Sequence, residues 1–233
     1  MPITKFSWAR LREHIRKFLW IYLVGIVVCL FGSNLIWTMT RPQVPIEQAV
    51  LVYMADAYSN PDPLNGIAQD MLVRGQEFDE TLQQVEFQSL QFTDPNTDYT
   101  SSMVMMARLS TGEGDVFLAN EDALNYLIGS GAALPLDDYV ANGWLSQYDL
   151  EPYYATVVAD EETGETETFM AALRLDEVDA LLELEAFNNE GAYLVIASNG
   201  TNIETSMKTV EIMIEDLMEG NYHVSAESTE PVT

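Results

Sequence analysis

The side chains that most often perform catalysis or bind metals are scarce in this chain and stand near its two ends. Of its 233 residues only two are histidine, His14 and His223, and only one is cysteine, Cys29. The long stretch between Cys29 and His223 therefore has no imidazole and no thiol, which excludes Ser–His and Cys–His nucleophiles and histidine-ligated metal sites there. We expect a protein that is not an enzyme and that holds no cofactor and no metal ion.

Carboxylates are the abundant reactive groups, with 37 Asp and Glu residues in the chain. Among so many, some pair always lies at the separation that glycoside hydrolysis needs, so such a pair has almost no predictive value. The segment Asp94–Asp98 resembles the start of a calcium loop, but Tyr99 stands where a glycine is needed and Met105 where a bidentate glutamate is needed. A polar loop that caps the following helix is the better interpretation.

Polar and aromatic residues directly follow three of the apolar runs of the chain, where a ligand could be bound. These residues are Asp56 and Tyr58 after the first run, Asn120 and Glu121 after another, and Ser198–Asn199 after a third. Because ligands of open α/β sheets bind beyond the carboxyl ends of the strands, we predict that Asp56, Tyr58, Asn120 and Glu121 contact a ligand at one rim, with Ser198–Asn199 as a further candidate. The alternative is purely structural: Asn120 caps a helix, and the others are loop residues.

The elements that must position these residues alternate between strand and helix patterns. Short apolar runs are typical of strands that are buried on both faces, and the longer segments between them have apolar residues at helical spacing. The alternation predicts an α/β domain of three layers, with a mainly parallel sheet covered on both faces. The expected strands are residues 49–55, 84–92, 115–119, 153–159, 166–173 and 193–197, and the expected helices are residues 65–78, 99–109, 121–128, 176–184 and 203–219. The strands at 153–159 and 166–173 are expected to form a hairpin.

Some finer expectations concern which way side chains point. In the second strand Val85 and Phe87 share one face, whereas Leu90 and Phe92 follow after a slip in the alternation. In the helix at residues 99–109 the methionines at 103 and 106 are expected to point inward. Methionines could also form a soft-metal or peptide-binding surface, but at helical spacing they more often belong to a core. Residues 132–152 are expected to be mostly loop.

A longer pattern lies in the segment Thr111–Val140. Gly114-Asp115-Val116 opens a strand that is followed by a helix, and Leu134-Pro135-Leu136 then leads into Asp137-Asp138-Tyr139. This pattern resembles a segment of the extracellular solute-binding proteins of ABC importers, and the order of strands and helices agrees with that family over residues 48–220. The resemblance implies a binding protein without catalytic activity, with a sugar or a peptide as ligand and an ABC permease or a full-length binding protein as partner.

The chain also departs from that family. Its members have two lobes that close on a ligand like a clamshell, and too few residues separate Tyr139 from the strand at 193–197 to form a second lobe. A single lobe exposes its ligand face to water, which weakens the binding of small molecules. The resemblance therefore implies one half of a periplasmic-binding-protein-like fold.

An uncharged apolar run of 22 residues, 18–39, lies near the start of the chain. As a helix it would extend roughly 33 Å, enough to cross a hydrocarbon core of about 30 Å. A cleaved signal peptide is the competing interpretation, but its apolar region should be roughly 7–15 residues long and end in a small-x-small site. We therefore expect an uncleaved signal anchor. Five of the ten Lys and Arg residues lie in the first 17 residues, which the positive-inside rule keeps in the cytoplasm.

These observations predict the division of the chain and its location. We expect a single-pass protein of the cell membrane, with its N-terminus in the cytoplasm and its C-terminal domain outside. The expected parts are a cytoplasmic basic segment (1–17), the transmembrane anchor (18–39), a linker (40–46), an extracytoplasmic α/β lobe (47–222) and a tail (223–233).

The charge of the chain narrows its possible partners. The net charge is −27, and 36 of the 37 acidic residues follow Glu13. So acidic a body repels phosphate backbones, which excludes nucleic-acid binding as a main activity. The first hypothesis is a non-catalytic, solute-binding-like domain that acts as an accessory to an ABC-type import or sensing system. The alternative is an interaction or scaffold subunit of a membrane complex that has kept the fold and lost its ligand.

Overall fold

The computed structural model describes residues 8–40, 44–93, 99–160 and 164–220, and the chain forms two compact units, residues 1–43 and 44–233. The described part of the first unit is the helix α1 (Trp8–Thr40). Its stretch Arg16–Asn34 is long and apolar enough to cross a membrane. This helix is either a signal sequence or a membrane anchor.

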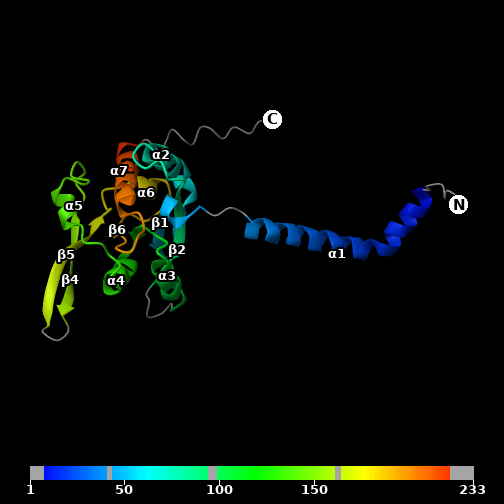
Figure 1. The fold of residues 1–233 in the computed structure, drawn as a ribbon, viewed down its shortest axis with the longest axis horizontal. Coiled ribbons are helices and arrows are strands. Elements are labelled where there is room, and N and C mark those ends of the chain that lie inside the picture. The colour runs from blue at the N-terminus through cyan, green and yellow to red at the C-terminus, as the bar shows by residue number, and fades with distance from the viewer. Residues whose placement is uncertain (1–7, 41–43, 94–98, 161–163, 221–233) are drawn as a thin grey trace. The chain divides into compact units, whose positions relative to one another are not determined.

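The second unit is built around one six-stranded mixed sheet (Figure 1). The strand order is β2-β1-β3-β6-β5-β4. Strand β1 pairs in parallel with β2 and β3, whereas β6 pairs antiparallel with β3 and β5, and β4 pairs antiparallel with β5. The strands are β1 (Ala49–Asp56), β2 (Gln84–Gln91), β3 (Val116–Ala119), β4 (Pro152–Asp160), β5 (Glu165–Arg174) and β6 (Tyr193–Ile196).

Helices cover both faces of this sheet, which gives the three layers of an α/β fold. One hydrophobic cluster joins one face of the sheet to α2, α6 and α7, and a second cluster joins the other face to α3 and α4. The helices of this unit are α2 (Asn65–Gly75), α3 (Tyr99–Thr111), α4 (Glu121–Gly129), α5 (Asp137–Ala141), α6 (Ala180–Glu183) and α7 (Ile203–Glu219), with short 3-10 helices at Ile46–Gln48 and Asp62–Leu64.

The apolar runs of the central strands follow from this layering. In β1, Val52 and Met54 belong to the cluster under α2 and α7, whereas Tyr53 and Ala55 belong to the cluster under α3 and α4. Because successive side chains of a strand point to opposite faces, a strand covered on both faces needs apolar residues at every position. The run at Ala49–Asp56 therefore predicts this environment correctly.

The sheet is not mainly parallel, and this corrects the expectation from the sequence. Only β2, β1 and β3 run in parallel; β6, β5 and β4 form an antiparallel half. Strands β4 and β5 form a hairpin, and the connection from β5 to β6 contains only the four-residue helix α6. A parallel crossover usually contains a helix that spans the sheet, whereas this connection, whose helix has only four residues, turns back at the same end.

Strand β2 lies at the edge of the sheet and contains no slip. Its register with β1 is continuous from Gln84 to Gln91. Val85 and Phe87 contribute to the cluster under α2 and α7, and Leu90, with Phe92 just beyond the strand, contributes to the cluster under α3 and α4. One face of this edge strand is thus covered near its start and the other face near its end. The apolar residues therefore change from odd to even positions in the sequence although the strand pairing is continuous.

Several helix expectations also need correction. The helix expected at 65–78 ends at Gly75, and the one expected at 176–184 is reduced to α6. The segment 132–152 contains the short helix α5. In α3 it is Met105 that is buried, whereas Met103 and Met106 are 56% and 63% exposed and do not point inward. The calcium-loop resemblance at residues 94–98 and the tail from residue 223 lie outside the described residues.

Candidate ligand site at the carboxyl rim of the sheet

Loops from both halves of the sheet meet at one rim. The parallel strands β1 and β3 end there, at Asp56 and Ala119. Strand β6 runs the opposite way, and its first residue, Tyr193, pairs with Ala119. The loop that precedes β6 therefore lies at the carboxyl rim of the parallel strands, beside the loop that follows β1.

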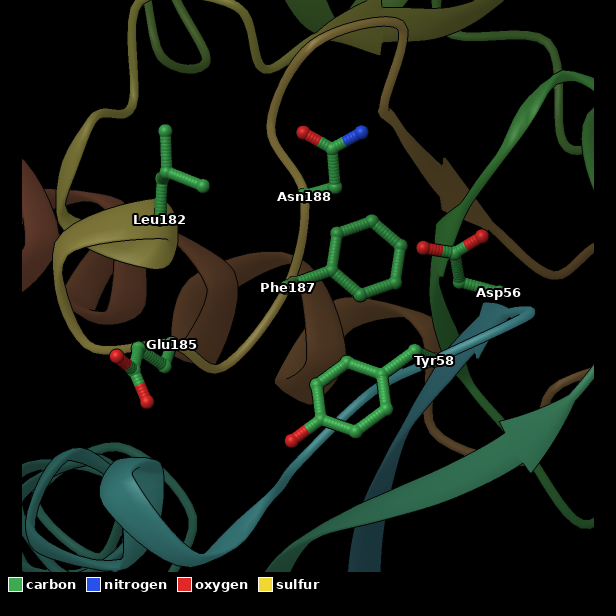
Figure 2. Close-up of a pocket in the computed structure, with 6 residues that line it drawn as sticks. All are labelled: Asp56, Tyr58, Leu182, Glu185, Phe187 and Asn188. Carbon is green, nitrogen blue, oxygen red and sulfur yellow. The ribbon is translucent and has the colours of Figure 1, made fainter.

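A hollow of about 320 Å³ opens between these two loops (Figure 2). Phe187 is only 2% exposed and forms its floor, whereas the ring of Tyr58 is 70% exposed and stands at its border. In the close-up, Asp56 and Glu185 lie on different sides of the Phe187 ring. The hollow thus combines aromatic surface with two carboxylates. The lining residues are Asp56, Tyr58, Leu182, Glu185, Phe187 and Asn188.

The backbone holds the two loops together. The N–H of Asn60 donates to the carbonyl oxygen of Ala186 at 2.8 Å, which joins the loop after β1 to the loop before β6. The hydroxyl of Ser59 donates to the carbonyl oxygen of Met54 at 3.0 Å and lies 2.7 Å from the hydroxyl oxygen of Ser89. The first bond joins the two loops, and the bonds of Ser59 hold the loop that carries Tyr58 against β1 and β2.

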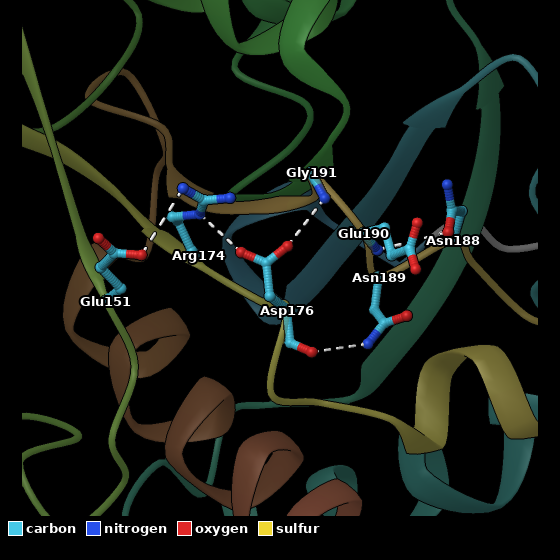
Figure 3. A network of polar contacts seen from close by, with 7 residues as sticks. All are labelled: Glu151, Arg174, Asp176, Asn188, Asn189, Glu190 and Gly191. Atoms are coloured by element: carbon cyan, nitrogen blue, oxygen red, sulfur yellow. Dashed lines mark hydrogen bonds and ion pairs between the residues drawn. The ribbon is translucent and has the colours of Figure 1, made fainter.

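A polar network around Asp176 holds the loop that precedes β6 at the end where it enters that strand (Figure 3). The carboxylate of Asp176 accepts from the N–H of Gly191 at 2.9 Å and from Nε of Arg174 at 2.6 Å. The side chain of Asn189, which is 2% exposed, donates to the carbonyl oxygen of Asp176 at 2.9 Å. The Gly191 N–H, together with Arg174, lowers the pKa of Asp176, so this carboxylate stays ionised and accepts both hydrogen bonds.

Asn120 caps a helix and is hydrogen-bonded to Asp56. Its side-chain oxygen accepts from the N–H of Ala123 at 2.9 Å, which caps α4. Its amide nitrogen donates to Oδ1 of Asp56 at 3.0 Å and to the carbonyl oxygen of Phe92 at 3.3 Å. The oxygen and the nitrogen of the Asn120 amide are thus both hydrogen-bonded, and the bond from the nitrogen orients the carboxylate of Asp56.

The structure brings together some of the residues that the sequence indicates. Asp56 and Tyr58 line the hollow, and Asn120 is bonded to Asp56. Glu121 is the exposed first residue of α4 and does not belong to the lining. Ser198–Asn199 lies at the opposite rim, because β6 is antiparallel: the N–H of Ser198 donates to the carbonyl oxygen of Ala132.

Four lining residues escape prediction from the sequence: Leu182, Glu185, Phe187 and Asn188. They precede β6, and in the expected parallel sheet a segment before a strand would lie at the amino ends. The connection between β5 and β6, residues 175–192, is long enough for a crossover, so its length gives no signal that β6 is antiparallel.

The charge around the hollow is negative. No Lys or Arg lines it. In the described part of the second unit every basic side chain already pairs with an acid: Arg74 with Glu215, Arg108 with Glu113, Arg174 with Asp176, and Lys208 with Glu204. Within the described residues no group of three or more His, Cys, Asp or Glu side chains could hold a metal ion.

Comparisons with known proteins add a distant likeness. No protein-family model matches the chain, and no curated protein matches its sequence. Among solved structures the chain is similar to a putative spermidine/putrescine ABC transporter from Listeria monocytogenes, with 10% sequence identity and a TM-score of 0.34 over 77% of this chain and 81% of that chain. A likeness at this level carries no argument about ligand or activity.

Proposed function

We propose that this protein is a non-catalytic, membrane-anchored solute-binding domain that works outside the cytoplasm as an accessory to an ABC-type import or sensing system. The observation that carries this proposal is the hollow between the loop after β1 and the loop before β6, with Tyr58 at its border and Phe187 at its floor. It lies beyond the carboxyl ends of parallel strands, which is where open α/β sheets bind ligands. Its volume is at the lower end of ligand pockets, which favours a small solute.

The charge of the hollow selects among solutes. Asp56 and Glu185 bring two carboxylates to it, and no Lys or Arg lines it. An anionic solute would be repelled by these carboxylates and also by the rest of the chain, whose net charge is −27. A neutral polyol could stack on Tyr58 and donate hydrogen bonds to the carboxylates. An organic cation would bind more tightly, because the carboxylates and the aromatic face both attract positive charge.

The membrane part of the proposal rests on α1. Its stretch Arg16–Asn34 can cross a membrane, and basic residues are concentrated before it. The positive-inside rule then keeps the N-terminus in the cytoplasm and places residues 44–233 outside. The apolar run of residues 18–39 is longer than that of most cleaved signal peptides, which supports an anchor.

Calorimetric titration tests the binding function. Residues 44–233 should be titrated with neutral hexoses, short peptides, an aliphatic diamine and a dicarboxylate, and we expect heat from at least one neutral or cationic solute and none from the dicarboxylate. Tyr58→Ala should then weaken binding about tenfold or more, because an aromatic face in a pocket contributes of the order of 1–3 kcal/mol.

Tyr154→Ala is the matched control for that titration. Tyr154 is 54% exposed on β4 and does not line the hollow, so its loss should leave the affinity unchanged. Absence of heat with every solute, or equal affinity of the Tyr58→Ala variant, would contradict the proposal.

A second candidate function is that of an interaction or scaffold subunit of a membrane complex. It is favoured by β4, which ends the strand order and so offers one side of its backbone to an added strand. Tyr154 and Val158 on this strand are 54% and 60% exposed. If this candidate is correct, Val158→Lys weakens the association with the membrane partner, and no solute binds in the titration above.

A further inference from the structure

The outward face of α3 is apolar although it is exposed. Tyr99, Met103 and Met106 are 74%, 56% and 63% exposed, and their spacing of four and three residues places them on one stripe. Val104 beside them is 41% exposed. The inward face of the same helix already packs Met105 and Leu109 into the core. A surface helix normally carries polar residues on its outer face, so this second apolar stripe needs another explanation.

The same region is free of negative charge in a strongly acidic protein. No Asp or Glu occurs between Asp98 and Glu113, or between Asp122 and Asp137. Among the described helices of the second unit, α3 alone contains no acidic residue. The two stretches without acidic residues are neighbours, since the hydroxyl of Tyr126 on α4 donates to the carbonyl oxygen of Ser102 on α3 at 3.2 Å. Together they form one face that lacks acidic residues, which we call the α3 face; its one basic residue, Arg108, pairs with Glu113.

A hollow lies directly beside the stripe. It has a volume of about 270 Å³, and Met106, Leu109 and Tyr126 contribute apolar surface to it, together with small residues such as Gly131 and Ala132. None of its lining residues is charged. Such a hollow can accept an unbranched side chain like that of methionine, which adapts its shape to the gap that it fills. The α3 face therefore carries both projecting methionines and a cavity of suitable chemistry for them.

We propose that the α3 face binds the α3 face of a second copy of this chain. Two copies with a net charge of −27 each repel one another over most of their surfaces, so they can approach closely only where acidic residues are absent. A basic partner would instead gain from acidic residues, which this face lacks. In a two-fold symmetric pair the same patch is used twice, so Met103 and Met106 of each copy lie against the hollow of the other.

The charge of the two copies predicts how the pair responds to salt. Repulsion between the acidic bodies opposes association, and added salt screens this repulsion while it leaves the apolar contact intact. The dimer should therefore become tighter as salt is added. An interface held by opposite charges would become weaker. A contact through one helix face is small, so we expect a weak, transient dimer.

Sedimentation of the full chain in a non-ionic detergent, over a range of concentrations, tests this proposal. The wild-type chain should show a concentration-dependent dimer that tightens with salt. Met106→Glu places an acid on the α3 face and should weaken the dimer about tenfold or more. Val73→Glu is the matched control, because Val73 on α2 is apolar and 57% exposed but lies outside the α3 face; it should leave the dimer unchanged.

Three results would overturn the proposal. A wild-type chain that stays monomeric at every concentration would exclude the pairing. A dimer that persists in the Met106→Glu variant would assign the contact to another part of the chain, such as α1. If Met106→Glu and Val73→Glu weakened the dimer equally, the weakening would come from the added net charge and not from the loss of a contact on the α3 face. The circular dichroism of both variants should match that of the wild type, because both positions are exposed.

Discussion

Asp115 stands just before β3 with its carboxyl group buried, and this burial makes stability depend on pH. The residue is 1% exposed. The N–H of Leu51 donates to its Oδ2 at 3.2 Å. Burial raises the pKa of Asp115 from 3.8 to about 6, although the backbone N–H groups of Leu51, Asn202 and Thr201 lower it.

The direction of the effect follows from the two pKa values. Between them the folded protein holds a proton that the unfolded chain has released, so the contribution of Asp115 is fully present below 3.8 and is lost as the pH rises through about 6. One pKa unit corresponds to about 1.4 kcal/mol, so the whole loss amounts to about 3 kcal/mol. Above neutral pH the buried carboxylate of Asp115 is ionised, and the free energy of unfolding is lower by this amount.

The substitution Asp115→Asn removes the titration and keeps the size of the side chain. We expect the free energy of unfolding of the variant, relative to wild type, to rise by roughly 2.5 kcal/mol between pH 4 and pH 7.5. The new amide also shifts stability by an amount that does not depend on pH, so the slope rather than the offset carries the test. Urea unfolding of residues 44–233 measures it through the fluorescence of Trp144, the single tryptophan of this unit, which is 8% exposed.

The control for this experiment is Asp149→Asn, since Asp149 is exposed. Its stability relative to wild type should not change over the same pH range. A difference between the Asp115→Asn variant and wild type that stays flat with pH would refute the reasoning, because it would mean that the folded and unfolded states hold this proton equally well. A difference that falls with pH would mean that the backbone N–H groups outweigh the burial.

Three further predictions concern strain, charge and topology. Gly114→Ala should destabilise residues 44–233 by about 2 kcal/mol or more in urea unfolding, because Gly114 has φ +110° and an added Cβ would lie 2.8 Å from the buried Tyr53 ring; Gly131→Ala, at φ +70° with open space around it, should cost less, and equal costs would contradict the argument. Added salt should raise the melting temperature of residues 44–233 by screening their self-repulsion, and a flat response would contradict this. Protease added outside intact cells should digest residues 44–233 and spare the first 17, whereas protection of the domain would reverse the proposed orientation.

The sequence predicts the parallel half of the sheet well, for a simple physical reason. Strands β1 and β3 lie under helices on both faces, so their burial is visible as apolar runs at Ala49–Asp56 and Val116–Ala119, whereas the edge strand β2 (Gln84–Gln91) is visible as an alternation of polar and apolar residues. Burial on both faces does not reveal direction, however. All four residues of β6 are buried, as in a central parallel strand, although β6 is antiparallel.

The wrong direction expected for β6 explains why most of the residues that line the hollow are missing from the predicted site. With β6 taken as parallel, the loop after it, at Ser198–Asn199, is assigned to the ligand rim, and Glu185 and Phe187 before it are assigned to the far end. Asp56 and Tyr58 line the hollow because they follow β1, whose direction sets the rim. The expectation that Met103 and Met106 point inward is wrong for a different reason: helical spacing alone does not tell an inner apolar stripe from an outer one.

Mapping of backbone amide chemical shifts tests the central claim, that the hollow at the carboxyl rim binds a solute, most directly. Residues 44–233 should be titrated with the neutral or cationic solute that gives heat in calorimetry. The largest shifts should occur at Ala57, Tyr58 and Asn60 in one loop and at Glu185 and Phe187 in the other, because the solute lies between these loops. Shifts confined to the hollow beside Met106, or spread evenly over the acidic surface, would contradict the account.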